Sequence, residues 1–205
     1  MFVPNVFSFA TEGKLFRYGS IKMPIDIWGP WRDEENQKEG ELRDVKANVE
    51  SLLRPEFVLD ILQNFTLFAT DSKHRRIKLI CRYQQYFTVN SILARVPKLG
   101  ADGRRLGGVV WHTQGSGKSL TMVMLAQSLA RETEIPNAVI VLVTDRVDLD
   151  LQIKKTFHHC GLEPMQAQTG KHLTKLITEG KATVITTVID KFASAVDAAP
   201  GAPAR

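Results

Sequence analysis

Cysteine is scarce in this 205-residue sequence, which has only Cys81 and Cys160. The two lie far apart and lack metal-type spacing, so neither a disulfide framework nor a metal cluster is predicted, and both thiols are expected to be reduced and structural. No apolar run approaches the roughly 18 residues of a membrane span. Residues 1–10 also lack the basic start and long apolar core of a secretion signal. We therefore expect a cytoplasmic protein with no membrane partner.

The sequence has enough apolar residues to form a core, since 43% of its residues are hydrophobic. Its charge is distributed unevenly. The length indicates one domain plus an appendage. Residues 33–44 are acidic and are expected to be a surface linker. Residues 71–105 carry nine basic side chains against two acids, a net charge of +7 within a chain of net +5. Such a stretch can attract a polyanion such as DNA, although a solvated face is the alternative.

The hydrophobic pattern predicts a β-hairpin at the start of the chain and helices after the acidic stretch. Residues 6–10 and 15–18 flank a glycine-containing turn. Residues 55–65 and 83–96 have apolar side chains at helical spacing, the first with proline near its start and the second stopping before Pro97. A small hairpin and helical segment is therefore expected before residue 107.

From residue 107 onward, expected strands and helices alternate. The expected strands are 107–112, 138–143 and 182–187, and the expected helices are 118–131, 147–157, 171–178 and 189–196. Alternation of this kind predicts an α/β fold, with a parallel sheet, flanking helices and ligands beyond the carboxyl ends of the strands. The tail 198–205 is small and proline-bearing, so it is expected to be disordered.

The most informative stretch is residues 109–119, Val-Val-Trp-His-Thr-Gln-Gly-Ser-Gly-Lys-Ser. An apolar run, a glycine turn and Lys-Ser before a helix are typical of a phosphate-binding loop. Backbone N–H groups of residues 115–118 would face one concavity, to which the helix N-terminus adds partial positive charge. Lys118 would reach the outer phosphates of a nucleotide, and the Ser119 hydroxyl would hold Mg²⁺. His112 departs from the general pattern, which has glycine there, and a plain glycine turn is the alternative.

Two further strings stand at the ends of the later expected strands, Thr-Asp-Arg at residues 144–146 and Thr-Thr at residues 186–187. Both resemble motifs of superfamily 2 helicases, in which such segments line a groove that contacts a nucleic-acid backbone. The DNA-binding set implied by this resemblance is Thr144, Asp145, Arg146, Thr186 and Thr187. Thr144 and Asp145 could instead cap the next helix, and the other two threonines could be ordinary strand residues.

The loop string Trp-His-Thr-Gln-Gly-Ser-Gly-Lys-Ser-Leu-Thr-Met, together with these motifs, resembles the R subunit of type I restriction enzymes most specifically. In that family histidine commonly stands at the position of His112. Residues 82–87, Arg-Tyr-Gln-Gln-Tyr-Phe, look like the glutamine motif that reads adenine, with Gln85 preferred to Gln84; a solvent-exposed pair is the alternative. The implied cofactors are ATP and Mg²⁺, and the implied nucleotide-binding set is Arg82, Gln85, His112, Gly115, Ser116, Gly117, Lys118 and Ser119. Lys118 is the implied catalytic residue.

The resemblance implies a partial first motor domain with a RecA-like sheet, belonging to a DNA-translocating and DNA-cleaving subunit. Its implied partners are double-stranded DNA and the methyltransferase and specificity subunits. The expected parts are a nuclease-domain remnant (1–40), a helical linker with the glutamine motif (41–106), the partial ATP-binding domain (107–197) and the tail (198–205). No nuclease carboxylate set and no Asp-Glu-x-His box is found. The alternatives are a truncated nucleotide-binding fragment without motor or nuclease activity and, last, a small kinase.

Overall fold

The computed structural model describes residues 5–33, 35, 37–71, 73–180 and 182–197. The chain divides into two compact units, Met1–Met124 and Leu125–Arg205, and each is described by itself. The predicted tail 198–205 lies outside the described residues. Within the described ranges, no helix is both long and apolar enough to cross a membrane.

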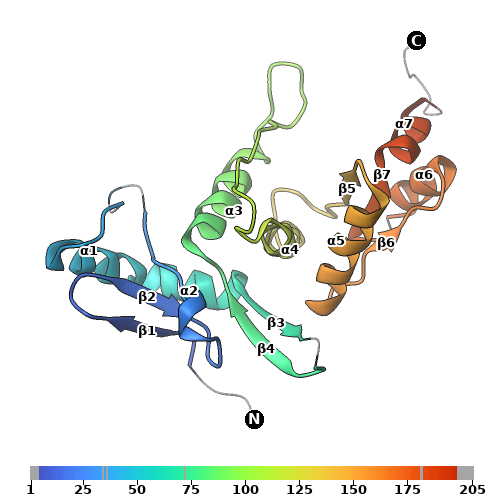
Figure 1. Cartoon of the computed structure of the whole chain (residues 1–205). Helices are drawn as coiled ribbons and strands as arrows, with labels where there is room; N and C mark the ends of the chain where they lie inside the picture. Colours follow the sequence, from blue (N-terminus) through green and yellow to red (C-terminus); the bar gives the residue numbers. More distant parts are fainter. Residues whose placement is uncertain (1–4, 34, 36, 72, 181, 198–205) are drawn as a thin grey trace. The chain divides into compact units, whose positions relative to one another are not determined.

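The first unit contains two antiparallel hairpins and three helices before the loop of residues 112–119 (Figure 1). In chain order its elements are β1 (Ser8–Thr11), β2 (Phe16–Gly19), a 3-10 turn η1 (Ile25–Ile27), α1 (Leu42–Leu52), α2 (Pro55–Asn64), β3 (Thr66–Thr70), β4 (Arg76–Ile80), α3 (Tyr83–Arg95) and the start of α4 (Lys118–Leu129). The first hairpin and the helices α2, α3 and α4 match the predicted elements closely. Helix α1 and the β3–β4 hairpin were not predicted.

An aromatic cluster around Trp31 forms the core of the first unit. Trp31 is fully buried, with its ring centroid 5.9 Å from that of Tyr18 in β2 and 5.5 Å from that of Tyr86 in α3. The Tyr18 hydroxyl donates to the Cys81 carbonyl at 2.8 Å, and the Trp31 indole donates to Ser51 Oγ of α1 at 3.1 Å. The first hairpin therefore shares one core with α1 and α3.

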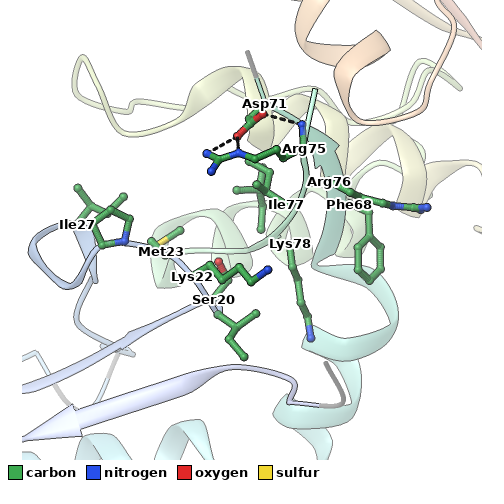
Figure 2. A pocket seen from close by; sticks show the side chains of 13 residues that line it. Ser20, Lys22, Met23, Ile27, Phe68, Asp71, Arg75, Arg76, Ile77 and Lys78 are labelled. Carbon is green, nitrogen blue, oxygen red and sulfur yellow. Dashed lines mark hydrogen bonds and ion pairs between the residues drawn. The ribbon is translucent and has the colours of Figure 1, made fainter. Parts of the chain in front are cut away.

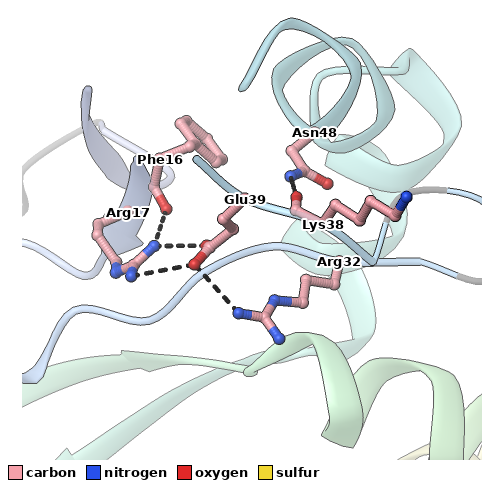
Figure 3. Close-up of polar contacts among 6 residues, drawn as sticks. All are labelled: Phe16, Arg17, Arg32, Lys38, Glu39 and Asn48. Carbon is pink, nitrogen blue, oxygen red and sulfur yellow. Dashed lines mark hydrogen bonds and ion pairs between the residues drawn. The ribbon is translucent and has the colours of Figure 1, made fainter. Parts of the chain in front are cut away.

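The acidic stretch is only partly the surface linker that we predicted. Glu39 accepts from Arg17 at 2.6 Å and from Arg32 at 3.1 Å, and its side chain is 15% exposed (Figure 3). Asp33 is 8% exposed and accepts from the hydroxyl of Ser51. Carboxylates that meet guanidinium or hydroxyl donors can be buried at acceptable cost, and a count of acidic residues does not reveal such partners.

The second unit is built on a parallel three-stranded sheet with strand order β5-β7-β6. Its elements after α4 are β5 (Ile140–Thr144), α5 (Val147–His159), β6 (Met165–Gln166), α6 (Gly170–Glu179), β7 (Val184–Val188) and α7 (Ile189–Asp197). Helix α5 packs against β5 and β7, while α6 and α7 pack against each other and against β7 (Figure 1). This arrangement confirms the predicted α/β class with a parallel sheet flanked by helices.

The core of the second unit lies between these helices and the sheet. It is formed by small and branched side chains: Ala167, Leu173, Leu176, Ala182, Ile185 and Ala195. Gly170 at the start of α6 comes so close to α7 that a Cβ atom there would lie 2.9 Å from the backbone nitrogen of Ala195. The helix pair α6–α7 therefore requires a residue without a side chain at position 170.

One predicted strand is wrong. Residues 107–112 form no strand within the described structure, and Val109 and Trp111 are 92% and 90% exposed. A β-strand is stabilised through hydrogen bonds to a neighbour, so an apolar run alone does not make one. The described residues supply no paired neighbour for this run.

Candidate nucleotide-binding loop and nucleic-acid contacts

Two glycines give the loop of residues 112–119 its shape. Gly115 has φ +79° and Gly117 has φ +86°, a left-handed conformation that favours glycine. The amide of Ser116 donates to the Thr113 carbonyl at 3.3 Å, and α4 begins at Lys118. The sequence thus predicted both the turn and the helix that follows it, although the strand before it is not formed.

Gln85 of α3 holds this loop directly. Its Nε2 donates to the Gly117 carbonyl at 3.1 Å, and its Oε1 accepts from the backbone N–H of Arg82 at 2.8 Å. A Cβ atom at Gly117 would lie 2.7 Å from Gln85 Nε2. Gln85 is 3% exposed, so the alternative of a solvent-exposed glutamine is wrong for this residue. The structure therefore brings the glutamine motif and the loop together.

Lys118 folds back over the loop. Its Nζ donates to the carbonyl oxygens of His112 at 3.0 Å and of Thr113 at 2.9 Å. The side chain remains exposed, and Ser119 beside it is half-buried. The ammonium thus lies against the first two carbonyls of the loop. These are neutral acceptors, and an anion could replace them with stronger, charge-assisted hydrogen bonds.

Two buried polar atoms around the loop have no partner within the described residues, Ser116 Oγ and His112 Nδ1. The other ring nitrogen of His112, Nε2, lies 2.9 Å from Thr88 Oγ1 of α3. Unpartnered buried polar atoms are uncommon in proteins. Together with the loop amides and the Lys118 ammonium, the free Ser116 hydroxyl is a donor set that fits a phosphate group.

Thr88 is a contact that sequence reasoning missed. It follows Gln85 by three residues in α3, a spacing that places two side chains on one helix face. That spacing was the available signal. Because Gln85 contacts Gly117 and Thr88 contacts His112, one face of α3 holds both ends of the loop. Arg82, the residue before α3, is exposed and meets Gln85 through its backbone.

In the second unit, the candidate nucleic-acid contacts lie at the end of β5, directly after it, and within β7. Thr144 is 7% exposed and donates to the carbonyls of Arg146 at 3.2 Å and Thr187 at 3.5 Å. Thr186 and Thr187 are fully buried, and Thr186 Oγ1 has no partner within the described residues. These three hydroxyls therefore face the protein interior.

Asp145 and Arg146 are exposed, by contrast. The Arg146 guanidinium forms a two-pronged pair with Asp148, with Nε 3.0 Å from Oδ1, and its side chain is 67% exposed. Hydrogen bonds from Arg146 hold the pKa of Asp148 below its ordinary value. A pair at the surface contributes little to stability, so Arg146 can exchange this partner for another anion at small cost.

A buried carboxylate at the start of α5 was also missed. Asp150 is 1% exposed and accepts from Gln166 of β6, while its Oδ1 has no partner within the described residues. Gln166 is paired with Thr186 in the β6–β7 register. Asp150 thus ties α5, the helix that begins directly after Arg146, to the far strand of the sheet.

Comparison with known proteins places these features in a family. Residues 84–202, more than half of the chain, match the model of the SWI2/SNF2 ATPase. The chain is 35% identical to the type I restriction enzyme HindI endonuclease subunit of Haemophilus influenzae, over 94% of this chain and 19% of that protein. It is 27% identical to the putative type I restriction enzyme MjaIXP endonuclease subunit of Methanocaldococcus jannaschii, over 93% of this chain and 20% of that protein. The chain therefore spans about a fifth of the length of these relatives.

Proposed function

The chain belongs to the SWI2/SNF2 ATPase family, and on that premise we propose that it is the ATP-binding part of the DNA-translocating and DNA-cleaving subunit of a type I restriction system. The observation that carries this proposal is the contact between Gln85 and Gly117, which joins an adenine-reading candidate to a phosphate-binding candidate. Resemblance to type I restriction endonuclease subunits supports double-stranded DNA and the methyltransferase and specificity subunits as partners. A cytoplasmic location is part of the same proposal.

Different residues in and around the loop would bind different parts of magnesium–ATP. The amides of residues 115–118 and the Lys118 ammonium would hold the phosphates, and the Ser119 hydroxyl would hold Mg²⁺. Gln85 would bind adenine, with Arg82 beside it, and His112 would line the loop. ATP, when bound, supplies a phosphoanhydride bond whose hydrolysis can drive movement. The parts proposed for the chain remain residues 1–40, 41–106, 107–197 and 198–205.

Replacing the loop lysine tests the nucleotide half of the proposal. Lys118→Ala is expected to weaken magnesium–ATP binding by about tenfold to a hundredfold, because a charge-assisted contact to phosphate is worth about 1.5–3 kcal/mol. Isothermal titration calorimetry measures the change, and Lys98→Ala, which removes another exposed lysine of the same unit, is the matched control. Undiminished affinity in Lys118→Ala would refute the proposal.

The DNA half rests on Arg146, since the threonines of the candidate groove are buried. Arg146→Gln is expected to weaken duplex DNA binding and to reduce the slope of log affinity against log salt by about 1, as one lost phosphate contact should. Lys155→Gln, which changes an exposed cation of helix α5, the helix that follows Arg146, is the control. An unchanged slope in Arg146→Gln would remove this residue from the DNA interface.

A nucleotide-binding protein without motor activity is the second candidate. For the purified chain we expect weak or no DNA-stimulated phosphate release under either candidate. Release at rates typical of helicases would show that the chain works as a motor by itself.

A further inference from the structure

A cavity of about 790 Å³ lies in the first unit (Figure 2), and no residue of the loop 112–119 is among its described lining residues. We call it the hairpin cavity. One wall is formed by residues 20–24 with Ile27, and the other by residues 75–79 with Phe68 and Asp71. None of these residues belongs to the candidate nucleotide-binding set or to the candidate DNA contacts. The cavity is therefore a feature that the proposed function has not used.

Positive charge dominates the lining. Asp71 is the single acid among the described lining residues, and Arg75 pairs with it at 2.8 Å. Lys22, Arg76 and Lys78 form no ion pair within the described part of the chain. Lys78 donates to the backbone carbonyl of Asn5, and its partial burial lowers its pKa. Three uncompensated cations around one concavity attract an anion, because a hollow low-dielectric surface focuses their field.

The backbone holds one of these cations in an unusual conformation. Lys22 has φ +64°, in the left-handed region that residues other than glycine rarely adopt, and the turn around it is closed by a 3.1 Å hydrogen bond from the Met23 amide to the Ser20 carbonyl. Strain of this kind costs on the order of 1–3 kcal/mol and concentrates at functional positions. Figure 2 shows Lys22 and Lys78 on the two walls of the cavity.

An aromatic ring lies beside two of the cations, Arg76 and Lys78. Phe68 of β3 is paired directly with Lys78 of β4, and the Arg76 guanidinium lies 5.3 Å from the centre of the Phe68 ring. Phe68 is 37% exposed. A stacked aromatic and arginine beside further cations is the arrangement by which proteins bind unpaired nucleic-acid strands, with bases on the flat groups and phosphates on the charges.

We propose that the hairpin cavity binds an unpaired nucleic-acid strand, with phosphates at Lys22 and Lys78 and a base stacked against Phe68 and Arg76. Duplex DNA fits less well, since its bases are stacked on each other and cannot reach the ring. A free nucleotide has the same base and phosphate chemistry as one nucleotide of a strand. It lacks the successive phosphates that could contact cations on both walls, so it should bind more weakly. The inference rests on the proposed function only in that this function gives the protein a DNA substrate.

Single-strand binding by the whole chain tests the inference. A labelled mixed-sequence oligodeoxynucleotide of about 16 nucleotides is titrated without ATP, and fluorescence anisotropy is followed at several salt concentrations. Lys22→Gln is expected to reduce the salt slope by about 0.7, the share of one phosphate on a single strand. Phe68→Leu is expected to weaken binding about fivefold or more with the slope unchanged, because it removes a stacking partner and no charge. Lys98→Gln, an exposed lysine outside the cavity, is the matched control.

Equal salt slopes for Lys22→Gln and Lys98→Gln would overturn the inference. Duplex DNA that binds as tightly as the single strand, and whose binding is weakened as much by Phe68→Leu, would also overturn it. A third contrary outcome is that free deoxyadenosine monophosphate displaces the labelled strand at the same concentration as an unlabelled copy of that strand. Circular dichroism checks folding, and should Phe68→Leu unfold the chain, the two lysine variants decide. The proposed function is tested by other measurements, nucleotide binding of Lys118→Ala and duplex binding of Arg146→Gln. Failure of the proposed function is therefore distinguishable from failure of this inference.

Discussion

In the first unit the candidate site residues surround an exposed loop, whereas in the second unit three of the five candidate contacts are buried beside a sheet. Gln85 and Thr88 hold the loop through its backbone carbonyl and its histidine. Thr186 and Thr187 are instead part of β7, the central strand of the β5-β7-β6 sheet. The comparison teaches that a phosphate-binding loop can be shaped by glycines and a few side-chain contacts, whereas a groove depends on which strand residues remain at the surface.

The largest effect is expected from the second unit, where tight packing leaves no room. Gly170→Ala would place a Cβ atom 2.9 Å from Ala195 N, and because this neighbour is backbone, α6 and α7 must separate. We expect a loss of about 3 kcal/mol in the free energy of unfolding, measured by urea denaturation. Gly180→Ala is the control, since its added Cβ meets nothing within 4 Å and only the strain of φ +61° remains. Equal losses in both variants would contradict tight α6–α7 packing.

The loop of the first unit should be more tolerant, because the atom that blocks a side chain there is the end of a flexible one. Gly117→Ala would bring Cβ to 2.7 Å from Gln85 Nε2 at φ +86°, so Gln85 must move and lose its bond to Gly117. The expected cost is about 2 kcal/mol in unfolding free energy, together with weaker nucleotide binding. Gly103→Ala has φ +72° and open space around it, so it isolates the strain. Should the two variants bind ATP equally, the contact with Gln85 does not position the loop.

The smallest effect is expected at the Arg17–Glu39–Arg32 cluster. Partial burial raises the pKa of Glu39, but hydrogen bonds and charges from Arg17 and Arg32 outweigh it, so its pKa lies below the ordinary value. A carboxylate with a lowered folded-state pKa stabilises the protein above its unfolded-state pKa, and this contribution is lost as the pH falls through the folded-state value. Glu39→Gln should therefore cost up to about 1 kcal/mol near neutral pH, and the difference from the parent protein should shrink below about pH 4.

Urea midpoints across this pH range measure the effect. Glu41→Gln, which changes a mostly exposed carboxylate of the same acidic stretch, is the matched control. A difference between Glu39→Gln and the parent that stays constant with pH would show that the cluster does not titrate with folding.

The sequence predicted elements that carry a clear apolar pattern, and it failed where that local pattern is weak or where the partners are distant. Helices α2, α3 and α5 were found from apolar spacing, and the parallel sheet from alternating elements. The β3–β4 hairpin was missed because the sequence between its two strands contains no glycine and because strand β4 carries charges. Helix α1 was missed because it begins at Leu42, inside a stretch that its acidic residues marked as a linker.

The candidate site shows the same limit. Glycine placement predicted the loop, but the bond between Gln85 and Gly117 joins residues 32 positions apart, and only a family resemblance suggested that they belong together. Burial of the Thr186 hydroxyl could not be predicted, because threonine suits both a strand interior and a surface contact. Residues 107–112 were predicted as a strand from their own composition, although a strand depends on a neighbour.

The exposure of Trp111 gives this molecule an optical reporter. Trp31 is completely enclosed, whereas Trp111 is 90% accessible and stands just ahead of the glycine loop. A soluble quencher such as acrylamide should therefore quench the emission of Trp111 first, that of the half-buried Trp28 next, and that of Trp31 least. A molecule that binds over this stretch would shield the Trp111 indole from the quencher. Its binding could then be measured as fluorescence that the quencher no longer removes.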